Sequence, residues 1–189
     1  MGICGHISSR IDKLDMKRAV FLDRDGVINR AIVRDGRPYP PADLEGLEIL
    51  PGVADAMHLL HKEGWLLIVV TNQPDVSRGK TQRADVEAIN LHLQQYLPID
   101  EFRTCYHDDN DRCNCRKPLP GALLAAADAH DIDLTSSFMV GDRWRDTEAG
   151  RRAGCKTIFL DYGYDEKQPG KYNHRVSSLA EASEIILGR

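Results

Sequence analysis

Two aspartates separated by one residue, Asp23 and Asp25, stand directly before Gly26. On extended backbone, residues i and i+2 point to the same side, so both carboxylates can face one crevice, and glycine lets the chain turn sharply away. Two acids this close repel each other, and a divalent cation relieves that repulsion. Taken alone, the motif favours an ordinary turn with solvated acids, so a chemical role needs support from elsewhere in the chain.

Three further groups of polar residues have matching chemistry. Thr71-Asn72-Gln73 offers a hydroxyl and amide donors to an anionic oxygen. Asp142 and Asp146 add carboxylates that suit a hard cation with oxygen ligands, such as Mg²⁺. Arg116-Lys117 adds a pair of cations. Each group also has an ordinary explanation, namely turn capping, acids at a helix N-terminus, or a solvated surface pair.

The elements that must position these residues alternate between strands and helices. Short apolar runs predict strands at residues 19–22, 65–70, 102–106, 137–140 and 155–160. Helical spacing predicts helices at 53–63, 81–97 with Thr81 as N-cap, 120–130, 143–153 and 179–187. Residues 26–50 contain Arg37-Pro-Tyr-Pro-Pro41 and are predicted to be irregular. The alternation of apolar strands with helices predicts an α/β fold, a parallel sheet covered by helices on both faces.

The carboxyl ends of parallel strands meet at one edge of the sheet, where such folds carry their working residues. The polar groups described above follow these strand ends. They are Asp23, Asp25, Thr71, Asn72, Lys117 and Asp142. Together they comprise a candidate nucleophile, a candidate general acid/base, a metal site and donors for a phosphate. This combination predicts phosphoryl transfer through an aspartyl-phosphate.

These motifs, in this order, resemble those of the haloacid dehalogenase (HAD) superfamily of phosphatases. The matching segments are Phe21-Leu-Asp-Arg-Asp-Gly-Val27, Thr71-Asn72-Gln73, Lys117, and Gly141-Asp142 with Asp146. The resemblance spans about residues 18–163 and implies a Rossmann-like fold. It implies Asp23 as nucleophile, Asp25 as general acid and then base, and stabilisation of the transferring phosphoryl group by Thr71 and Lys117. It further implies Mg²⁺ held by Asp23, the backbone carbonyl of Asp25, and Asp142, with Asp146 as a supporting acid.

A cysteine-rich loop, residues 105–118, lies just before and around Lys117. Cys105, His107, Cys113 and Cys115 supply four ligands, which is the set of a closed structural zinc site. A disulfide and a redox pair are the alternatives. We expect zinc to brace the loop that presents Arg116 and Lys117.

This loop is similar to that of two groups within the superfamily. One removes the 7-phosphate of D-glycero-D-manno-heptose 1,7-bisphosphate, and the other acts on histidinol phosphate. The Arg78-Gly79 pair favours the heptose group, whereas Pro74 replaces the serine common there. The resemblance implies substrate contacts at Ala31, Ile32, Val33, Arg34, Asn72, Gln73, Pro74, Arg116 and Arg143. Arg30 and Arg37 could join Arg34 and Arg116 around a second phosphate, or they could be solvated surface residues.

Length and composition exclude several other classes. The 189 residues favour a flexible leader at 1–17 and a single domain at 18–189, without an insertion long enough for a cap domain. A net charge of −4 argues against nucleic-acid binding. No apolar stretch suits a membrane span or a signal peptide, which predicts a cytoplasmic protein. We expect a monomer that acts on a small phosphate ester.

Two rival classes share part of the pattern. A phosphomutase would use the same nucleophile chemistry but normally carries a cap. A zinc-dependent binding module would explain the cysteines but would leave Asp23, Asp25 and Asp142 without a role.

Overall fold

A six-stranded sheet forms the centre of the protein. The structure, a computed structural model, describes residues 16–189. The strand order is β5-β4-β1-β6-β7-β8, and all neighbouring strands are parallel. The strands are β1 (Ala19–Leu22), β4 (Leu66–Asn72), β5 (Glu101–Cys105), β6 (Phe138–Gly141), β7 (Lys156–Leu160) and β8 (His174–Val176). The helices are α1 (Val53–Lys62), α2 (Arg83–Tyr96), α3 (Gly121–His130), α4 (Trp144–Ala153) and α5 (Leu179–Leu187).

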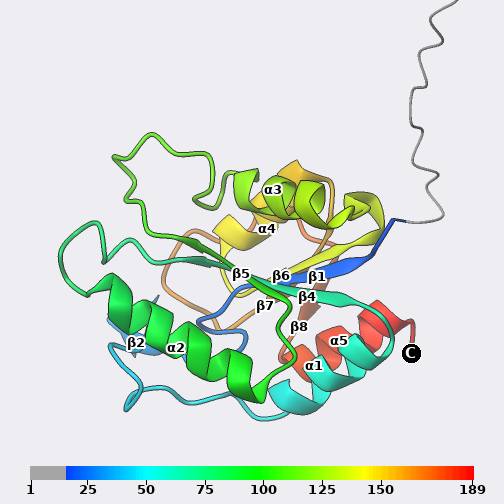
Figure 1. The fold of residues 1–189 in the computed structure, drawn as a ribbon, viewed down its shortest axis with the longest axis horizontal. Helices are drawn as coiled ribbons and strands as arrows, with labels where there is room; N and C mark the ends of the chain where they lie inside the picture. Colours follow the sequence, from blue (N-terminus) through cyan, green and yellow to red (C-terminus); the bar gives the residue numbers. More distant parts are fainter. Residues whose placement is uncertain (1–15) are drawn as a thin grey trace, which may run out of the picture.

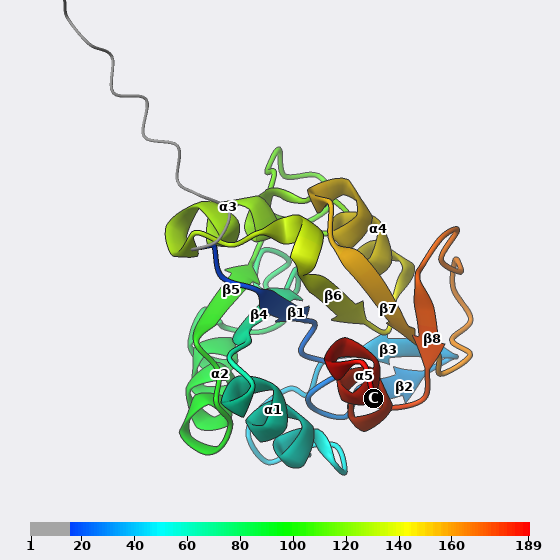
Figure 2. The same cartoon turned by 90° about the vertical axis from the view of Figure 1, so that its right-hand side faces the viewer.

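Helices cover both faces of the sheet, which confirms the predicted α/β fold. Helices α3 and α4 lie on one face, and α1, α2 and α5 lie on the other (Figure 1; Figure 2 gives the perpendicular view). Strand β1 serves both layers. Ala19 and Phe21 pack with α3 and α4, whereas Val20 and Leu22 pack with α1 and α5. A strand buried on both faces has no polar side to expose, so its sequence is continuously apolar.

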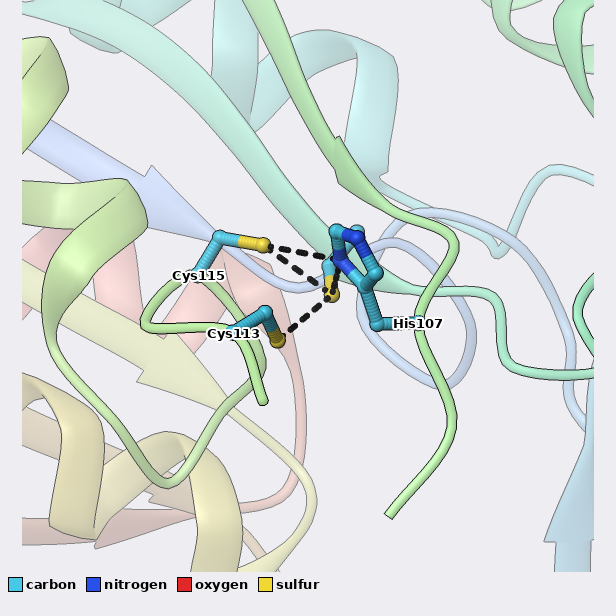
Figure 3. Close-up of side chains that lie close together, drawn as sticks. His107, Cys113 and Cys115 are labelled. Carbon is cyan, nitrogen blue, oxygen red and sulfur yellow. Dashed lines mark hydrogen bonds between the residues drawn. The ribbon is translucent and has the colours of Figure 1, made fainter. Parts of the chain in front are cut away.

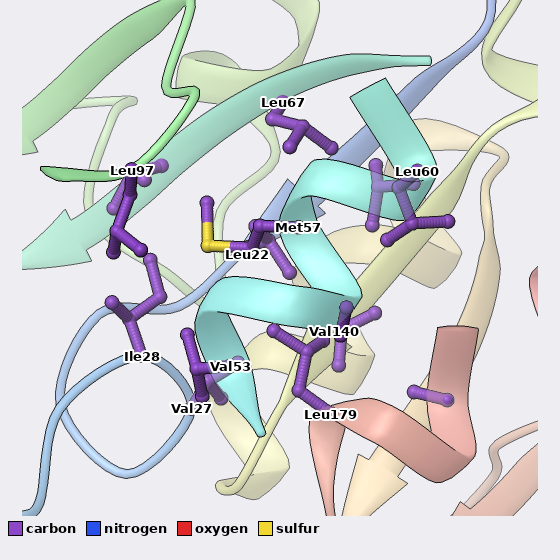
Figure 4. Close-up of a cluster of buried hydrophobic side chains, with 14 of the residues drawn as sticks. Leu22, Val27, Ile28, Val53, Met57, Leu60, Leu67, Leu97, Val140 and Leu179 are labelled. Atoms are coloured by element: carbon purple, nitrogen blue, oxygen red, sulfur yellow. The ribbon is translucent and has the colours of Figure 1, made fainter. Parts of the chain in front are cut away.

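The larger of the two cores lies beneath α1. Leu22 and Leu67 of the sheet meet Met57 and Leu60 of α1 and Leu179 of α5 (Figure 4). All five side chains are buried. This core also takes in Val27 and Ile28, the residues that follow the Asp-Gly turn after β1. The turn that carries Asp23 and Asp25 is therefore anchored by apolar burial on its far side.

A β-hairpin occupies part of the segment predicted to be irregular, so that prediction was wrong for six of its residues. Strands β2 (Ile32–Arg34) and β3 (Arg37–Tyr39) pair antiparallel, with Arg34 opposite Arg37. The connecting residues Asp35 and Gly36 both have positive φ, at 50° and 71°. A two-residue turn with positive φ at both positions matches the twist of a hairpin, and Asp-Gly is a sequence signal for it.

Other element boundaries also differ from the prediction. Strand β4 continues through Thr71 and Asn72, because these residues stay in register with Thr104 and Cys105 of β5. Helix α2 begins at Arg83 with Gln82 as N-cap, so Thr81 is not the cap. Arg143 is the N-cap of α4 rather than its first residue. The three-residue strand β8 was not predicted, and within residues 16–189 it pairs with β7 alone.

The described part of the chain begins near the end of the predicted leader. Most of the predicted leader, residues 1–15, lies outside the described residues. Lys17 is bound on both sides, since its N–H donates to Asp131 and its carbonyl accepts from Asp133. Beyond the sheet and helices, residues 16–189 contain the β2–β3 hairpin and no insert of cap-domain size. Within the same residues, no helix is long and apolar enough to cross a membrane.

Candidate active site and cysteine cluster

The carboxyl ends of the three central strands bring the predicted catalytic residues to one edge. Strand β1 lies between β4 and β6, and Asp23 follows β1 directly. The N–H of Asp23 donates to the carbonyl of Val140 in β6, at 2.9 Å. Thr71 is the second-last residue of β4, and Asp142 follows β6. Asp23 therefore stands in the middle of this edge, with a hydroxyl on one side and a carboxylate on the other.

Lys117 reaches into this edge from the segment between β5 and α3. Its Nζ atom lies 2.8 Å from Oδ1 of Asp23 and 2.6 Å from Oδ1 of Asp146. It also donates to the carbonyl of Val70, at 2.6 Å. Burial alone would lower the pKa of Lys117, but the charges of Asp146 and Asp23 outweigh it and raise that pKa. Asp23 and Asp146 therefore favour the charged form of this ammonium, which lies beside the candidate nucleophile.

Asp23, Asp142 and Asp146 form a buried cluster of carboxylates. Each offers one oxygen that lies within 4.8 Å of the others. Burial, opposed by Lys117, raises the pKa of Asp23 to about 6. Burial and the charges of Asp23 and Asp146 raise the pKa of Asp142 well above its usual range. Three buried acids with one lysine leave an excess of negative charge, and such a site favours a bound cation.

The side chain of Asp142 gives the clearest indication of a cation site. Both of its oxygens are buried, and within residues 16–189 neither makes a hydrogen bond of standard geometry, although the Tyr164 hydroxyl is near enough to lower the pKa of Asp142. Gly26 faces this carboxylate, and a Cβ atom at that position would overlap with Oδ2 of Asp142. The missing side chain at Gly26 lets this carboxylate lie against the turn that carries Asp23, and buried oxygens without good partners fit a hard cation such as Mg²⁺.

Asp25 lies outside the carboxylate cluster and accepts hydrogen bonds from three side chains. Arg24 donates to both of its oxygens, at 3.1–3.2 Å. Asn29 donates to Oδ1 at 3.0 Å and Gln73 to Oδ2 at 2.8 Å. The Asp25 side chain is therefore not placed to coordinate a cation held by Asp142, which is compatible with the predicted ligand being its backbone carbonyl.

The amides predicted to bind substrate also organise the site. Asn72 exchanges two hydrogen bonds with the backbone of Lys117, at 2.9 and 3.1 Å. Gln73 is buried and donates to Oγ1 of Thr71 at 2.9 Å as well as to Asp25. These amides fix Lys117, Thr71 and Asp25 relative to one another.

A small cavity opens above Asp23. It measures about 60 Å³, and its lining includes the predicted residues Asp23, Asp25, Thr71, Asn72, Lys117 and Asp146. Tyr39 of β3 and the following Pro40 also line it, together with Arg143 and Arg145 at the start of α4. Sequence reasoning missed Tyr39, Pro40 and Arg145. The Asp-Gly turn signal at residues 35–36 could have indicated a hairpin that ends at Tyr39 and Pro40.

A groove of about 680 Å³ adjoins this cavity, and Tyr39 and Pro40 line both. Arg34 of the hairpin lines the groove, and so does Lys80 of the loop 74–80, which sequence reasoning also missed. The predicted contact segment 31–34 is divided by the hairpin. Ala31 and Val33 line a separate hollow of about 270 Å³ with Tyr162 and Tyr164, and Ile32 lines neither.

Four arginines predicted to bind the second phosphate or to contact the substrate differ in their charge balance. Arg30 pairs with Glu48 at 2.6 Å, and Arg116 pairs with Asp109 at 2.9 Å. Arg143 is paired with Glu166, which raises the pKa of Arg143 against the effect of its burial. Arg34 lies 5.9 Å from the centre of the Tyr39 ring and has no ion pair within residues 16–189. Of these arginines, Arg34 is thus the one that lines the groove with an uncompensated charge.

The four predicted zinc ligands come together in the loop after β5. Sγ of Cys115 lies 3.3 Å from Sγ of Cys105 and 3.3 Å from Nδ1 of His107, and Sγ of Cys113 lies 4.0 Å from Cys105 (Figure 3). A tetrahedral zinc with Zn–S bonds of about 2.3 Å places its sulfur ligands about 3.8 Å apart. The cluster therefore has the dimensions and the donor set of a zinc site, and no disulfide joins its cysteines.

Acidic residues of the cysteine loop hold the neighbouring loop 74–80. Arg78 donates to Asp108 at 2.6 Å and lies 3.6 Å from Asp109. Ser77 donates to Asp111 at 3.0 Å. Because Lys80 follows in the same loop, the cysteine loop supports the wall of the groove that carries this lysine.

Comparison with known proteins agrees with this geometry. The sequence profile of the HAD-hydrolase-like family matches residues 114–182. The D-glycero-beta-D-manno-heptose-1,7-bisphosphate 7-phosphatase of Pasteurella multocida is 32% identical over 187 residues, which cover 92% of this chain and 98% of that protein. The corresponding enzyme of Salmonella typhi is 37% identical over 154 residues, covering 75% and 79%.

Solved structures lead to the same group. The D,D-heptose 1,7-bisphosphate phosphatase from B. bronchiseptica, complexed with magnesium and phosphate, superimposes with a TM-score of 0.74 at 30% identity, covering 90% of this chain and 98% of that one. A putative HAD-like phosphatase from Mesorhizobium loti reaches a TM-score of 0.71 at 29% identity, covering 90% and 88%. The fold and these relationships define a phosphatase, a hydrolase of phosphoric monoesters. The chain belongs to the HAD-like hydrolase family.

Proposed function

We propose that this phosphatase removes the 7-phosphate of D-glycero-D-manno-heptose 1,7-bisphosphate through a covalent intermediate on Asp23. The observation that carries the chemistry is the contact of Lys117 with Asp23, beside the unpartnered carboxylate of Asp142. The proposed substrate follows from the relatives named above, two of which cover most of this chain.

Asp23, the backbone carbonyl of Asp25, and Asp142 would hold Mg²⁺, with Asp146 in support. When bound, the ion neutralises charge on the carboxylates and on the phosphate oxygens. Lys117 supplies a further positive charge at the same place and keeps Asp23 ionised. Thr71, at the end of β4, offers its hydroxyl to a phosphate oxygen on the opposite side of Asp23.

The reaction then proceeds in two displacements. A carboxylate oxygen of Asp23 bonds to phosphorus, the bond from phosphorus to the sugar oxygen breaks, and Asp25 gives its proton to that oxygen. In the second step Asp25 takes a proton from a water molecule, whose oxygen bonds to phosphorus. The bond from phosphorus to Asp23 breaks, and inorganic phosphate leaves.

The two hollows at the site support a substrate with anions at both ends. The 60 Å³ cavity suits a single phosphate group, and the adjoining 680 Å³ groove leaves room for a sugar. Arg34 and Lys80 line this groove, and neither has an ion pair within residues 16–189, so both can bind a second phosphate. Arg116, also predicted to bind the second phosphate, lines neither the cavity nor the groove and is paired with Asp109.

Histidinol phosphate is the second candidate. It also presents a primary phosphate, but its other end is cationic. The groove lining combines Arg34 and Lys80 with Asp75 and Asp85, so its charge does not exclude a cation. Histidinol phosphate ranks second because the relatives named above act on the heptose bisphosphate. We further propose that Cys105, His107, Cys113 and Cys115 hold a structural zinc that braces the loop carrying Arg116 and Lys117. The monomeric state stays a prediction that gel filtration checks. The cytoplasmic location also stays a prediction.

The test is phosphate release from a panel of heptose 1,7-bisphosphate, histidinol phosphate and hexose monophosphates. We expect the highest kcat/KM for the bisphosphate, with heptose 1-phosphate as its product. A tenfold preference for histidinol phosphate, equal to about 1.4 kcal/mol in transition-state binding, would overturn the proposed substrate. An isomeric bisphosphate as product, without release of phosphate, would indicate a phosphomutase.

A further inference from the structure

Arg24, between the two aspartates of the first motif, is completely buried, with 0% of its surface exposed. It is the largest of the fully buried side chains in residues 16–189. The mechanism described above gives it no task. A guanidinium is seldom fully buried, because removing it from water costs several kcal/mol unless its donors are well paired. The contacts of Arg24 therefore indicate what it does.

The guanidinium holds Asp25 in a fixed orientation. Nε donates to Oδ1 of Asp25 at 3.2 Å, and Nη2 donates to Oδ1 and Oδ2, both at 3.1 Å. On the far side, Nη1 donates to Oδ1 of Asn90 at 2.9 Å. Asn90 is itself buried in α2 and donates to Thr104 of β5 at 3.1 Å. Arg24 thus ties the candidate acid/base to a helix and a strand, rather than to its own loop alone.

The backbone of Arg24 fixes the turn as well. Its carbonyl accepts from the N–H groups of Val27, Ile28 and Asn29, at 3.3, 2.8 and 3.1 Å. Val27 and Ile28 are buried in the core beneath α1. The rigid planar fork of arginine is suited to orienting a carboxylate, and lysine cannot reproduce it.

A purely structural role for Arg24 is the competing explanation. A buried ion pair contributes little to stability compared with apolar residues of the same volume, so stability alone gives a weak reason for an arginine at this place. The orientation of Asp25 gives a stronger one, because the proton on this residue must reach the leaving oxygen. General acid catalysis depends on such placement and contributes about 10²–10⁴-fold.

We infer that Arg24 is a positioning residue that sets the orientation of Asp25 for proton transfer to the leaving group. The inference rests on the proposed aspartyl-phosphate chemistry and is independent of which sugar phosphate is the substrate. It predicts that Arg24 matters for leaving groups that need a proton and matters little for those that do not.

The test compares two substrates in Arg24→Met, Arg24→Lys and wild-type protein. One is the best sugar phosphate of the panel above, whose alkoxide must be protonated. The other is p-nitrophenyl phosphate, whose nitrophenolate leaves without a proton. We expect Arg24→Met to lower kcat/KM about 30-fold or more for the sugar phosphate and less than about threefold for the aryl ester. Arg24→Lys should fall between wild type and Arg24→Met.

The ratio of the two kcat/KM values does not depend on how much of a variant is correctly folded, since both substrates report on the same active molecules. Arg18→Met is the matched control. It makes the same exchange at the amino end of β1, where Arg18 is exposed and stacks on Trp65, and it should leave the ratio unchanged. If Arg24→Met does not fold, Asn90→Ala removes the other anchor of the guanidinium and should shift the ratio in the same direction by a smaller factor.

A second readout concerns the hydrolysis step. If Asp25 is misplaced as a base, the covalent intermediate accumulates, and rapid mixing of Arg24→Met with p-nitrophenyl phosphate gives a burst of nitrophenolate. Equal losses on both substrates, with no change in the burst, would overturn the inference and assign Arg24 a structural role. Activity retained in Asp23→Asn would contradict the aspartyl-phosphate mechanism itself, and that result does not depend on the Arg24 variants.

Discussion

Lys117 Nζ lies 2.8 Å from Oδ1 of Asp23, although 94 positions separate the two residues in the chain. The contact is completed by Asp146, whose Oδ1 lies 2.6 Å from the same nitrogen. One ammonium therefore balances two carboxylates and holds the first of them at the end of β1. Since both partners are buried, this relationship is less screened by solvent than a surface ion pair and depends on the whole sheet edge being assembled.

Replacing the nucleophile should abolish turnover. We expect Asp23→Asn to lower kcat by at least about 10⁴-fold, because no other carboxylate follows β1 at this position to take up the phosphoryl group. The unfolding temperature should not fall, since the substitution removes a buried negative charge. Steady-state assays and a thermal melt check both points. Asp128→Asn, an exposed acid on α3, is the control. A variant that keeps a tenth of wild-type turnover would contradict the covalent mechanism.

A methyl group at Gly26 should damage the metal site. Gly26→Ala places a Cβ atom onto Oδ2 of Asp142 and imposes strain at a φ of +93°. Gly64→Ala is matched in backbone strain, with a φ of +81°, but its Cβ atom meets nothing within 4 Å. We expect the Mg²⁺ concentration for half-maximal activity to rise at least about tenfold in Gly26→Ala and to stay unchanged in Gly64→Ala. Similar values for both variants would argue against Asp142 as a ligand.

The stabilising effect of Mg²⁺ should grow with pH. The pKa of Asp23 is raised from 3.8 to about 6, and that of Asp142 is raised well above normal. Between the ordinary and the raised pKa of Asp23, the folded protein binds more protons than the unfolded chain. The free energy of unfolding of the metal-free protein therefore falls as pH rises from about 4 to about 6. Mg²⁺ competes with those protons for the same carboxylates.

We therefore expect Mg²⁺ to raise the unfolding temperature little at about pH 5 and more at about pH 8. Thermal melts with Mg²⁺ and with chelator, at both pH values, provide the measurement. Asp142→Asn should remove most of the difference. An equal shift at the two pH values would show that Mg²⁺ does not bind at these acids.

The cysteine cluster should carry zinc that is separable from catalysis. We expect about one zinc per chain in the purified protein by elemental analysis. Cys113→Ser should lose the metal, and its free energy of unfolding should fall by about 2–5 kcal/mol, the range typical of losing a disulfide or a structural metal. It should still hydrolyse phosphate esters, at a lower rate. Cys155→Ser, which changes a buried cysteine outside the cluster, should keep its zinc. Native protein without zinc would refute the assignment.

Lys80 should distinguish substrates with a second phosphate from those without. We expect Lys80→Ala to raise KM about tenfold for heptose 1,7-bisphosphate and less than about twofold for heptose 7-phosphate, since only the former has an anion to place in the groove. Lys171→Ala removes the same charge from a different hollow of the surface and should change neither value. Equal changes in KM for both substrates would place the second phosphate elsewhere.

The layered fold could be predicted from sequence because burial dictates residue type. Val20, Phe21 and Leu22 lie on a strand covered on both faces, and such a strand must be apolar throughout. The cluster of Cys105, His107, Cys113 and Cys115 could likewise be predicted, since four side chains so close in the chain need only a loop to bring them together. The aspartates and Lys117 were found because each follows a predicted strand or precedes a predicted helix.

The tertiary structure alone decides which of the arginines predicted to contact the substrate have an ion-pair partner. Arg34 and Arg143 look alike in the sequence, but Glu166 compensates Arg143, whereas Arg34 has no ion pair in the part of the chain that the structure describes. In the same way, nothing in the sequence distinguishes Arg24 as the buried partner of Asp25 from a surface arginine. A charged side chain is compatible with many surroundings, and distant segments decide what surrounds it, as Glu166 does for Arg143 and Asn90 does for Arg24. Only the folded arrangement of those segments determines which charges are neutralised and which are left to bind a substrate.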